Sequence, residues 1–297
     1  MKRLLKWIGY IIGGLVGLVV LAVALVYVIS SSRMSRIYAT QVEAVAIPTD
    51  SATIDRGHHL VVAVGKCTDC HGDKLAGKLV ADDPAFARLW GANLTRGKGG
   101  VGTTFSDADY VRSIRYGVKP DGKPIIFMPS DAYTHFTDAD LGAIIAYVKS
   151  VPPVDQVTSA PQIGPIMRML SVTVREFPLV TAEMIKRGDP HPVTVPVGVT
   201  KEYGDYLVTT GGCKGCHNLN LSGGVKIQGV PSANLTPAGI GGWTEADFVK
   251  GLRTGVRPDG RILSAVMPWL YTKNLTNGEL QAMWMYIHNV PARPTGS

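Results

Sequence analysis

Two short motifs in this chain combine cysteine and histidine in an order that can hold a metal cofactor covalently. Cys-x-x-Cys-His occurs twice, and the two copies contain all four cysteines. They comprise Cys67, Cys70 and His71, and Cys213, Cys216 and His217. In this order each cysteine can form a thioether to a porphyrin vinyl group, and the histidine can bind the iron as its proximal ligand. The spacing therefore predicts two covalently attached c-type hemes and, with them, electron transfer.

Other chemistries use pairs of cysteines at this spacing. Such a pair can bind zinc, form a redox disulfide or crosslink a secreted fold. A zinc site made of four cysteines would not use the histidine that follows each pair. Two copies, each with its histidine and with no cysteine left over, favour heme.

A sixth iron ligand is available after each motif in a Met-Pro pair, Met128-Pro129 and Met267-Pro268. A thioether is a soft ligand that suits heme iron, and Met/His ligation raises the reduction potential. The proline restricts the backbone that presents the methionine. His135, seven residues beyond Met128, is the alternative distal ligand in the first copy.

The motifs lie in an internal repeat. Asn-Leu-Thr occurs at 93–95 and 234–236, and Arg-x-Gly-Val-x-x-Asp-Gly occurs at 115–122 and 253–260. The order is the same in both halves, while the offset is 146 at the first cysteine (213 − 67) and 139 at the methionine (267 − 128). Insertions and deletions in loops explain this difference. We therefore predict two homologous single-heme domains, residues 51–153 and 200–293.

Apolar periodicity predicts that these domains are helical. The last helix of each copy has apolar residues at i, i+3, i+4 and i+7: Leu141, Ile144, Ile145 and Val148, then Leu280, Met283, Trp284 and Ile287. Capping patterns begin these helices at Thr137 and Thr276, and the preceding helices at Ser106 and Thr244. A short helix before each cysteine pair contains Gly57 or Gly204, which allows close approach to a helix bearing Tyr147 or Tyr286.

Four polar residues recur at equivalent places, Asn93, Arg115, Asn234 and Arg253. They are candidates to bind a heme propionate, for which the planar arginine fork is suited, or to order the loop that carries the methionine. An arginine on a helix surface is the ordinary alternative. Tyr133 and Tyr271 are expected to pack in the core, and His58 and His59 to lie on a helix surface.

On these motifs the chain resembles the membrane-bound cytochrome c subunits that accept electrons from bacterial alcohol and gluconate-type dehydrogenases. The resemblance covers about residues 50–153 and 200–293. It implies a mainly α fold with two tandem class I cytochrome c domains, with His71 and His217 as proximal and Met128 and Met267 as distal iron ligands. The chain departs from the triheme members of that group in having only two motifs.

The segment from Trp7 to Ile29 has 23 residues without a charge, and about 20 are needed to cross a bilayer as a helix. Lys2, Arg3 and Lys6 precede it, which favours a cytoplasmic N-terminus, residues 1–6, with the heme domains on the periplasmic side of the inner membrane. A cleaved signal peptide is the alternative, but its apolar region is normally about 7–15 residues long.

Gly9, Gly13 and Gly17 share one face of this helix, and such small residues let another membrane helix pack closely. This face predicts a partner subunit in an integral complex, although glycine is also common in membrane helices. Residues 30–50 are expected to form a polar tether.

Residues 154–199 are rich in proline and are expected to form an extended strap between the two domains. Residues 294–297, after the second domain, are expected to form a short tail. Because residues 163–180 of the strap are largely apolar, they are expected to pack along both domains and hold the two hemes as a short electron path.

The formal charge of +7 overstates the basicity of the outer surface, because five basic residues flank the apolar segment. Nucleic acid is not an expected partner in the periplasm. The sequence thus predicts a membrane-anchored diheme cytochrome c that passes single electrons from a dehydrogenase or quinol-oxidising complex to an oxidase, a soluble cytochrome or a photosynthetic centre. The alternative is a diheme redox enzyme, such as a peroxidase or an oxidoreductase of small sulfur compounds, with a displaceable axial ligand.

Overall fold

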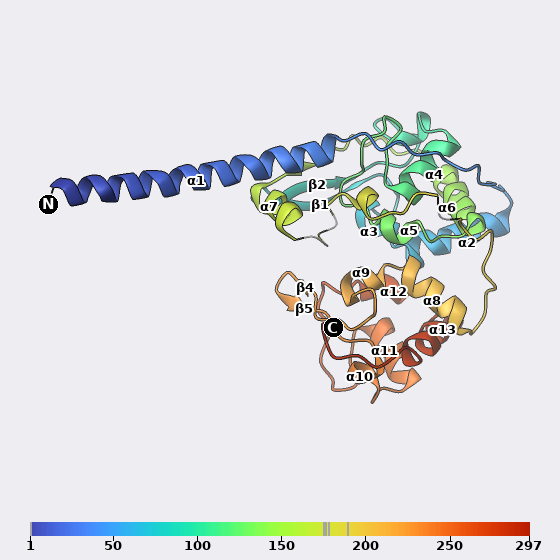
Figure 1. The fold of residues 1–297 in the computed structure, drawn as a ribbon. Helices are drawn as coiled ribbons and strands as arrows, with labels where there is room; N and C mark the ends of the chain where they lie inside the picture. Colours follow the sequence, from blue (N-terminus) through green and yellow to red (C-terminus); the bar gives the residue numbers. More distant parts are fainter. Residues whose placement is uncertain (1, 175–176, 178, 189) are drawn as a thin grey trace.

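The computed structural model describes residues 2–174, 177, 179–188 and 190–297, and consists of one long helix and two mainly helical units (Figure 1). Residue 1 and the strap positions 175, 176, 178 and 189 lie outside the described residues. The mainly α fold is confirmed. The units lie one below the other in Figure 1, and the long helix projects from the first.

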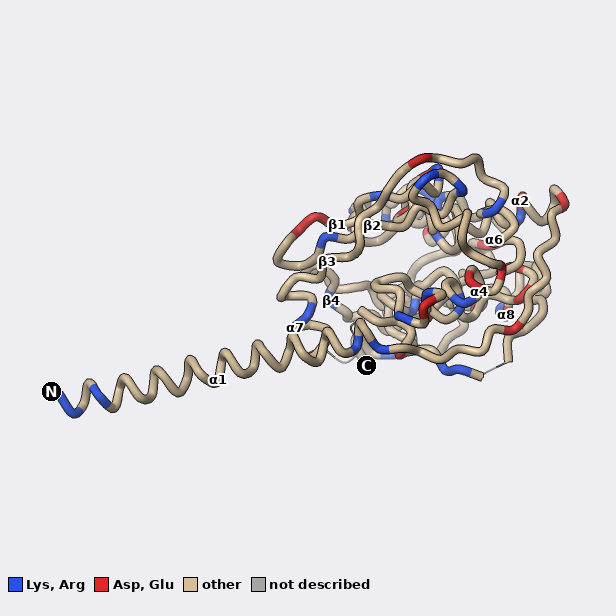
Figure 2. The backbone as a smooth tube through the Cα atoms, turned by 90° about the horizontal axis from the view of Figure 1, so that it is seen from above, with Lys and Arg blue, Asp and Glu red and all other residues tan. Residues whose placement is uncertain are grey.

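Helix α1 (Lys2–Ser35) contains the predicted apolar segment. Figure 2 shows basic residues at its N-terminal end, followed by a long stretch without charge. The helix is long and apolar enough to cross a membrane, and no residue of its apolar window is buried inside the protein. A Cβ added at Gly9, Gly13 or Gly17 would meet nothing within 4 Å, so this face of the helix is open.

The first unit is built on helices α2 and α6, which cross closely. A Cβ built at Gly57 would lie 2.0 Å from the carbonyl oxygen of Ala143 and 2.8 Å from Cβ of Tyr147, so only glycine fits this crossing. The helical segments of this unit are α2 (Ser51–His59), η1 (Leu60–Val64, a π-helical turn), α3 (Cys67–His71), η2 (Val101–Thr103), α4 (Asp107–Tyr116), α5 (Ser130–Tyr133) and α6 (Asp138–Ser150).

The second unit repeats this crossing with α8 and α13. A Cβ built at Gly204 would lie 2.0 Å from the carbonyl oxygen of Ala282 and 2.8 Å from Cβ of Tyr286. The helices of this unit are α8 (Lys201–Thr210), α9 (Cys213–His217), α10 (Pro237–Ile240), α11 (Glu245–Thr254), α12 (Trp269–Thr272) and α13 (Asn277–His288). The close approach of Tyr147 and Tyr286 to these glycines is as predicted.

The predicted helix starts are confirmed. Thr137 and Thr276 each accept a hydrogen bond from the backbone amide three residues later, at the starts of α6 and α13. Ser106 and Thr244 do the same for α4 and α11, as parts of complete capping boxes. These bonds satisfy amides that would otherwise lack a partner in the first helical turn.

Short strands accompany the helices. In the first unit β1 (Lys78–Asp83), β2 (Ala87–Gly91) and β3 (Gln162–Ile163) form an antiparallel sheet in that order, and β4 (Lys226–Ile227) pairs with β5 (Val230–Pro231) in the second. The sequence analysis did not anticipate them. The two-residue strands β3, β4 and β5 carry too little alternation to be recognised without their partners.

The strap is more structured than the extended segment expected from the sequence. Its described part contains β3, helix α7 (Pro165–Thr173) and a 3₁₀ turn, η3 (Thr181–Glu183). Met167 and Leu179 are almost fully buried in the core. The reason for the difference is that these apolar residues bury their side chains by folding back on the first unit and on α1.

Candidate heme attachment sites

Each Cys-x-x-Cys-His motif forms one short helix, α3 or α9. On a helical turn, residues three and four apart lie on one face, so the two cysteines and the histidine face the same side. Lys66 and Gly212 precede the helices with φ of 52° and 70°, and Gly72 and Asn218 follow them with φ of 74° and 68°. The two motifs therefore adopt the same backbone path.

The histidines of the two motifs make the same second contact. Nδ1 of His71 lies 2.7 Å from the carbonyl oxygen of Ala92, and Nδ1 of His217 lies 2.7 Å from that of Ala233. Burial lowers the pKa of both imidazoles, and the carbonyl contact opposes it. A neutral ring that donates from Nδ1 keeps its lone pair on Nε2, which is the form that binds a metal.

The cysteines lie in surroundings that disfavour thiolates. Burial raises the pKa of Cys67 to about 12 and also raises the pKa values of Cys70, Cys213 and Cys216. Zinc binding and thiol redox chemistry both require thiolates. The described residues also contain no group of three or more His, Cys, Asp and Glu side chains placed to hold a metal ion.

The two methionines occupy equivalent positions, and both pack partly buried against the core. Pro129 and Pro268 follow them with nearly equal backbone angles and begin the short helices α5 and α12. In the first unit the strap holds this loop, because the Thr181 hydroxyl donates to the carbonyl of Met128 at 2.7 Å.

The recurring asparagines lie inside the fold. The Asn93 amide donates to the carbonyls of Val154 and Gln156 at 2.8 and 3.0 Å, and its oxygen accepts from the amide of Thr95. In the second unit the Asn234 amide donates to the carbonyl of Arg293 at 2.8 Å. Each asparagine thus ties its Asn-Leu-Thr loop to the segment that follows the last helix of its unit.

The recurring arginines bind the segment between the methionine and the last helix. Arg115 donates from Nη2 to the carbonyl of Phe136 at 3.0 Å, and Arg253 donates to the carbonyl of Lys273. Arg115 is wholly buried, with Nη1 2.9 Å from Asp138 and with Nε lacking a hydrogen-bond partner. An unpaired, buried guanidinium N–H is a donor that a carboxylate such as a heme propionate can use.

The remaining aromatic candidates have partners in the protein. Tyr133 is buried, stacks on Phe136 and donates to the carbonyl of Gly65 at 2.5 Å, so its expected core packing is confirmed. Tyr271 instead donates to Asp69 of the first motif at 2.8 Å, across the two units.

Three histidines outside the motifs were considered in the sequence analysis, and the structure places them differently. His58 is exposed and its ring lies 4.9 Å from that of Tyr147, as expected for a helix surface. His59, in contrast, binds Glu279 of the second unit. His135 lies two residues after the end of helix α5 and is exposed.

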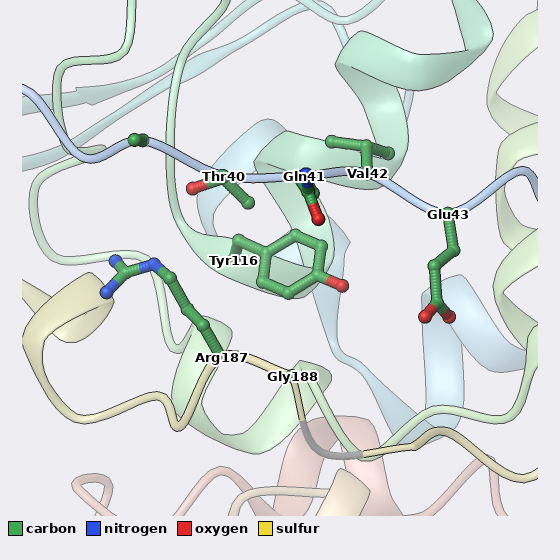
Figure 3. Close-up of a pocket in the computed structure, with 8 residues that line it drawn as sticks. Thr40, Gln41, Val42, Glu43, Tyr116, Arg187 and Gly188 are labelled. Carbon is green, nitrogen blue, oxygen red and sulfur yellow. The ribbon is translucent and has the colours of Figure 1, made fainter.

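A cavity of about 680 Å³ lies away from the motifs, beside Tyr116 (Figure 3). It is lined by residues 39–43 of the tether, Tyr116, Arg187 and Gly188. None of these residues is a cysteine, histidine or methionine, so this cavity is not a candidate heme cleft.

Sequence reasoning missed two features of the site. One is the carbonyl that orients each histidine; its signal was the recurrence of alanine before Asn-Leu-Thr, at Ala92 and Ala233. The other is Lys66, whose buried ammonium donates to the carbonyls of Val64 and Gly211 and so links the residues that precede the two motifs. No pattern in the sequence marks that contact, because 145 residues separate Lys66 from Gly211.

Comparison with known proteins finds relatives among cytochrome subunits. Residues 52–148 match the family described as cytochrome c oxidase, cbb3-type, subunit III. The chain is 28% identical to the fructose dehydrogenase cytochrome subunit of Gluconobacter japonicus, over 81% of this chain and 53% of the relative.

Two further relatives are dehydrogenase subunits. The gluconate 2-dehydrogenase cytochrome c subunit of Pantoea cypripedii is 29% identical over 69% of this chain and 52% of its own length. The quinone-dependent alcohol dehydrogenase cytochrome c subunit of Gluconacetobacter polyoxogenes is 33% identical over 29% of this chain and 21% of its own. The chain thus spans about half, or less, of the curated relatives it matches. The predicted resemblance to cytochrome c subunits of bacterial dehydrogenases is confirmed, and residues 52–148 are a cytochrome c domain of the kind that carries covalently bound heme c.

Proposed function

We propose that this protein is a membrane-anchored diheme cytochrome c that transfers single electrons. Residues 51–153 and 200–293 are its two heme domains, joined by the strap 154–199. The observation that carries the proposal is the identical histidine geometry in the two motifs, with Nδ1 2.7 Å from a backbone carbonyl in each. A second motif without a heme would have no need to keep this contact.

The residues of the two copies have matching roles in this proposal. The cysteines would hold the heme through thioethers, and the histidines and methionines would be the ligands to its iron: Cys67, Cys70, His71 and Met128, then Cys213, Cys216, His217 and Met267. Asn93, Asn234, Arg115 and Arg253 hold the loops around each heme, and Arg115 has a free donor for a propionate. The bound iron supplies a centre that gains and loses one electron at a time.

The packing of the two units supports transfer between them. Asp69 of the first motif accepts a hydrogen bond from Tyr271, which follows Met267, at 2.8 Å. The second motif contacts the first unit in the same way. A Cβ built at Gly212, just before the second motif, would lie 3.9 Å from Cβ of Ala132, which follows Met128. The motif of each unit thus contacts the methionine segment of the other, which brings the two candidate heme sites to one shared boundary.

The relatives support a dehydrogenase as electron donor. Three of the relatives that match are cytochrome subunits of dehydrogenases named for fructose, gluconate or alcohol. We propose that this chain accepts electrons from a dehydrogenase of a small organic substrate, or from a quinol-oxidising complex. The acceptor is an oxidase, a soluble cytochrome or a photosynthetic centre. Helix α1 anchors the chain, and the heme domains lie on the periplasmic side, where bacterial c-type hemes are attached.

The heme number tests the proposal directly. The pyridine hemochrome assay, with protein measured by amino-acid analysis, is expected to give two hemes per chain that resist extraction by acidic acetone. Replacing Cys67 and Cys70 by Ala should leave one heme, and replacing Cys213 and Cys216 by Ala should leave the other. One heme in the unaltered chain, or full heme content in either double variant, contradicts the diheme assignment.

Carbon monoxide distinguishes the carrier from a diheme enzyme. With methionine bound on each iron, the reduced protein should bind carbon monoxide slowly and incompletely. Rapid stoichiometric binding at one heme would show an open iron position, as a peroxidase or a sulfur-compound oxidoreductase needs, and would contradict a purely electron-transferring role.

A further inference from the structure

The short helix α7 of the strap packs against the last turns of α1. Arg168 of α7 donates to the hydroxyls of Ser30 and Ser31 at 2.9 and 3.0 Å, and its guanidinium carbon lies 4.9 Å from the ring centre of Tyr27. Ser30 is completely buried by this contact. The position of α7 along α1 is therefore defined at residues 27–31.

Aromatic residues mark the level of α1 at which this contact occurs. Trp7 and Tyr10 lie near one end of the apolar segment, with ring centres 6.2 Å apart, and Tyr27 lies near the other. Such residues prefer the two interfaces of a bilayer. Tyr27 lies 17 positions after Tyr10, which is a rise of about 26 Å in a helix and close to the ~30 Å hydrocarbon core. Tyr27, and with it Arg168, thus lies at the outer interface.

The free face of α7 suits that environment. Ile166 and Met169 are 45% and 48% exposed, and Thr173 continues the same face four residues later. The exposed residues of α7 carry no charge, because its single charged residue, Arg168, is turned to α1. The opposite face is packed, with Met167 fully buried.

We propose that α7 lies in the outer headgroup region of the bilayer, with Ile166 and Met169 inserted among the lipid chains. The occupant of this face is lipid, because the face is uncharged and continues from the membrane helix at its aromatic interface level. In Figures 1 and 2, α7 lies at the edge of the globular part from which α1 projects. The inference rests on the proposed role of α1 as an anchor.

The consequence is a fixed orientation of the first heme domain on the membrane. A single helix followed by a flexible tether would let the domain rotate. Here Glu183 binds Arg33 of α1 at 2.6 Å and accepts from Tyr38 of the tether at 2.8 Å, which joins the strap, the helix and the tether. With α7 in the lipid, the domain has a second point of attachment beside α1.

The test measures water and lipid contact at one position of α7 in the full heme-loaded chain. Met169→Cys is compared with Met285→Cys. Met285 is an exposed methionine of α13, and in Figure 1 that helix lies on the side of the molecule away from α1. The native cysteines are in thioether bonds in the heme-loaded protein, so each variant has one free thiol. The chain is inserted into phosphatidylcholine vesicles, some of whose lipids carry a photoactivatable diazirine on an acyl chain. A charged, impermeant maleimide then probes each thiol.

The expected result is labelling at position 169 at least ten times slower than at 285, with lipid crosslinks in residues 165–174. Equal labelling rates in a chain that stays in the membrane after an alkaline carbonate wash overturn the inference alone. Slow labelling without lipid crosslinks also overturns it, because another protein surface then covers the face. Loss of the chain from the vesicles in that wash instead contradicts the anchor itself. Unchanged heme absorbance in both variants confirms that they fold.

Discussion

His59 of the first unit and Glu279 of the second form a contact across the boundary between them, with Nε2 2.8 and 2.9 Å from the two carboxylate oxygens. Glu279 is 4% exposed and also accepts a hydrogen bond from the amide of Thr276 at the start of α13. A matching contact runs the other way, since Tyr206 of α8 donates to Asp140 of α6 at 2.6 Å. Each unit thus presents a first-turn carboxylate to the opposing unit.

This contact predicts a dependence of stability on pH. Burial by itself would raise the pKa of Glu279, but the hydrogen bonds from His59 and Thr276 and the charge of Arg56 outweigh it, and the pKa lies below its ordinary 4.5. A lowered pKa in the folded state stabilises the fold above pH 4.5, and this stabilisation is lost as pH falls through the folded value.

Glu279→Gln should therefore lower the free energy of unfolding by about 1–3 kcal/mol at pH 7. Glutamine can keep the capping contact, so the change removes mainly the charge. Thermal unfolding followed by circular dichroism should show the two proteins converging at acidic pH. A difference of the same size at pH 7 and pH 3.5 would contradict the assignment.

A second prediction concerns Gly91, at the end of β2. A Cβ built there would lie 1.9 Å from the carbonyl oxygen of Cys70, so Gly91→Ala must push the strand away from the first attachment helix. The displacement should reduce heme content at the first site and destabilise the fold by about 1–3 kcal/mol.

Gly215→Ala is the matched control, because Gly215 lies inside the second motif and an added Cβ would meet nothing within 4 Å. It should retain full heme content. The hemochrome assay and thermal unfolding of both variants check the pair. Equal heme content in the two would mean that the close approach of β2 does not matter for attachment.

A third prediction follows from the different support of the two methionine loops. The strap holds Met128 through Thr181, and the amide of Phe127 donates to the carbonyl of Leu179 at 3.1 Å. The loop before Met267 is more open, with Ile262 74% exposed. Imidazole should therefore replace the methionine more readily at the second heme of the oxidised protein.

Titration of the two single-heme double cysteine variants, followed by absorbance, compares the sites separately. Thr181→Ala should make the first heme bind imidazole at lower concentration and leave the second unchanged. Equal imidazole affinities at the two hemes of the unaltered chain would contradict the claim that the Met128 loop is held more firmly than the Met267 loop.

A fourth prediction concerns the glycine face of α1. Gly13→Leu should weaken association with a partner helix, because the larger side chain prevents close approach. Gly14→Leu, one residue along and also with nothing within 4 Å of its Cβ, is the matched control. The measurement is the set of polypeptides that co-purify with the heme absorbance from membranes in mild detergent. Recovery of the unaltered chain alone would contradict a fixed partner at this face.

Local patterns were sufficient for several parts of this protein. The helix starts at Thr137 and Thr276 and the glycines at the helix crossings were predicted from the sequence and are confirmed. The two cysteine motifs were recognised by their spacing, and the structure gives both the same backbone path. Each of these depends on residues within a few positions of one another, or on a spacing that recurs in the second half. A turn of helix and its cap are local, so their signal is complete in the sequence.

The tertiary structure decided the partners of the polar residues. The sequence offered Arg115 as a residue that binds a propionate or orders the methionine loop, and only the fold shows its contacts with Phe136 and Asp138. His59 was expected on a helix surface, but it binds a carboxylate 220 residues away. The strap was expected to be extended, but α7 forms where α1 offers Ser30 and Tyr27 to Arg168. Such contacts depend on how the elements pack, and packing joins surfaces that no local sequence pattern relates.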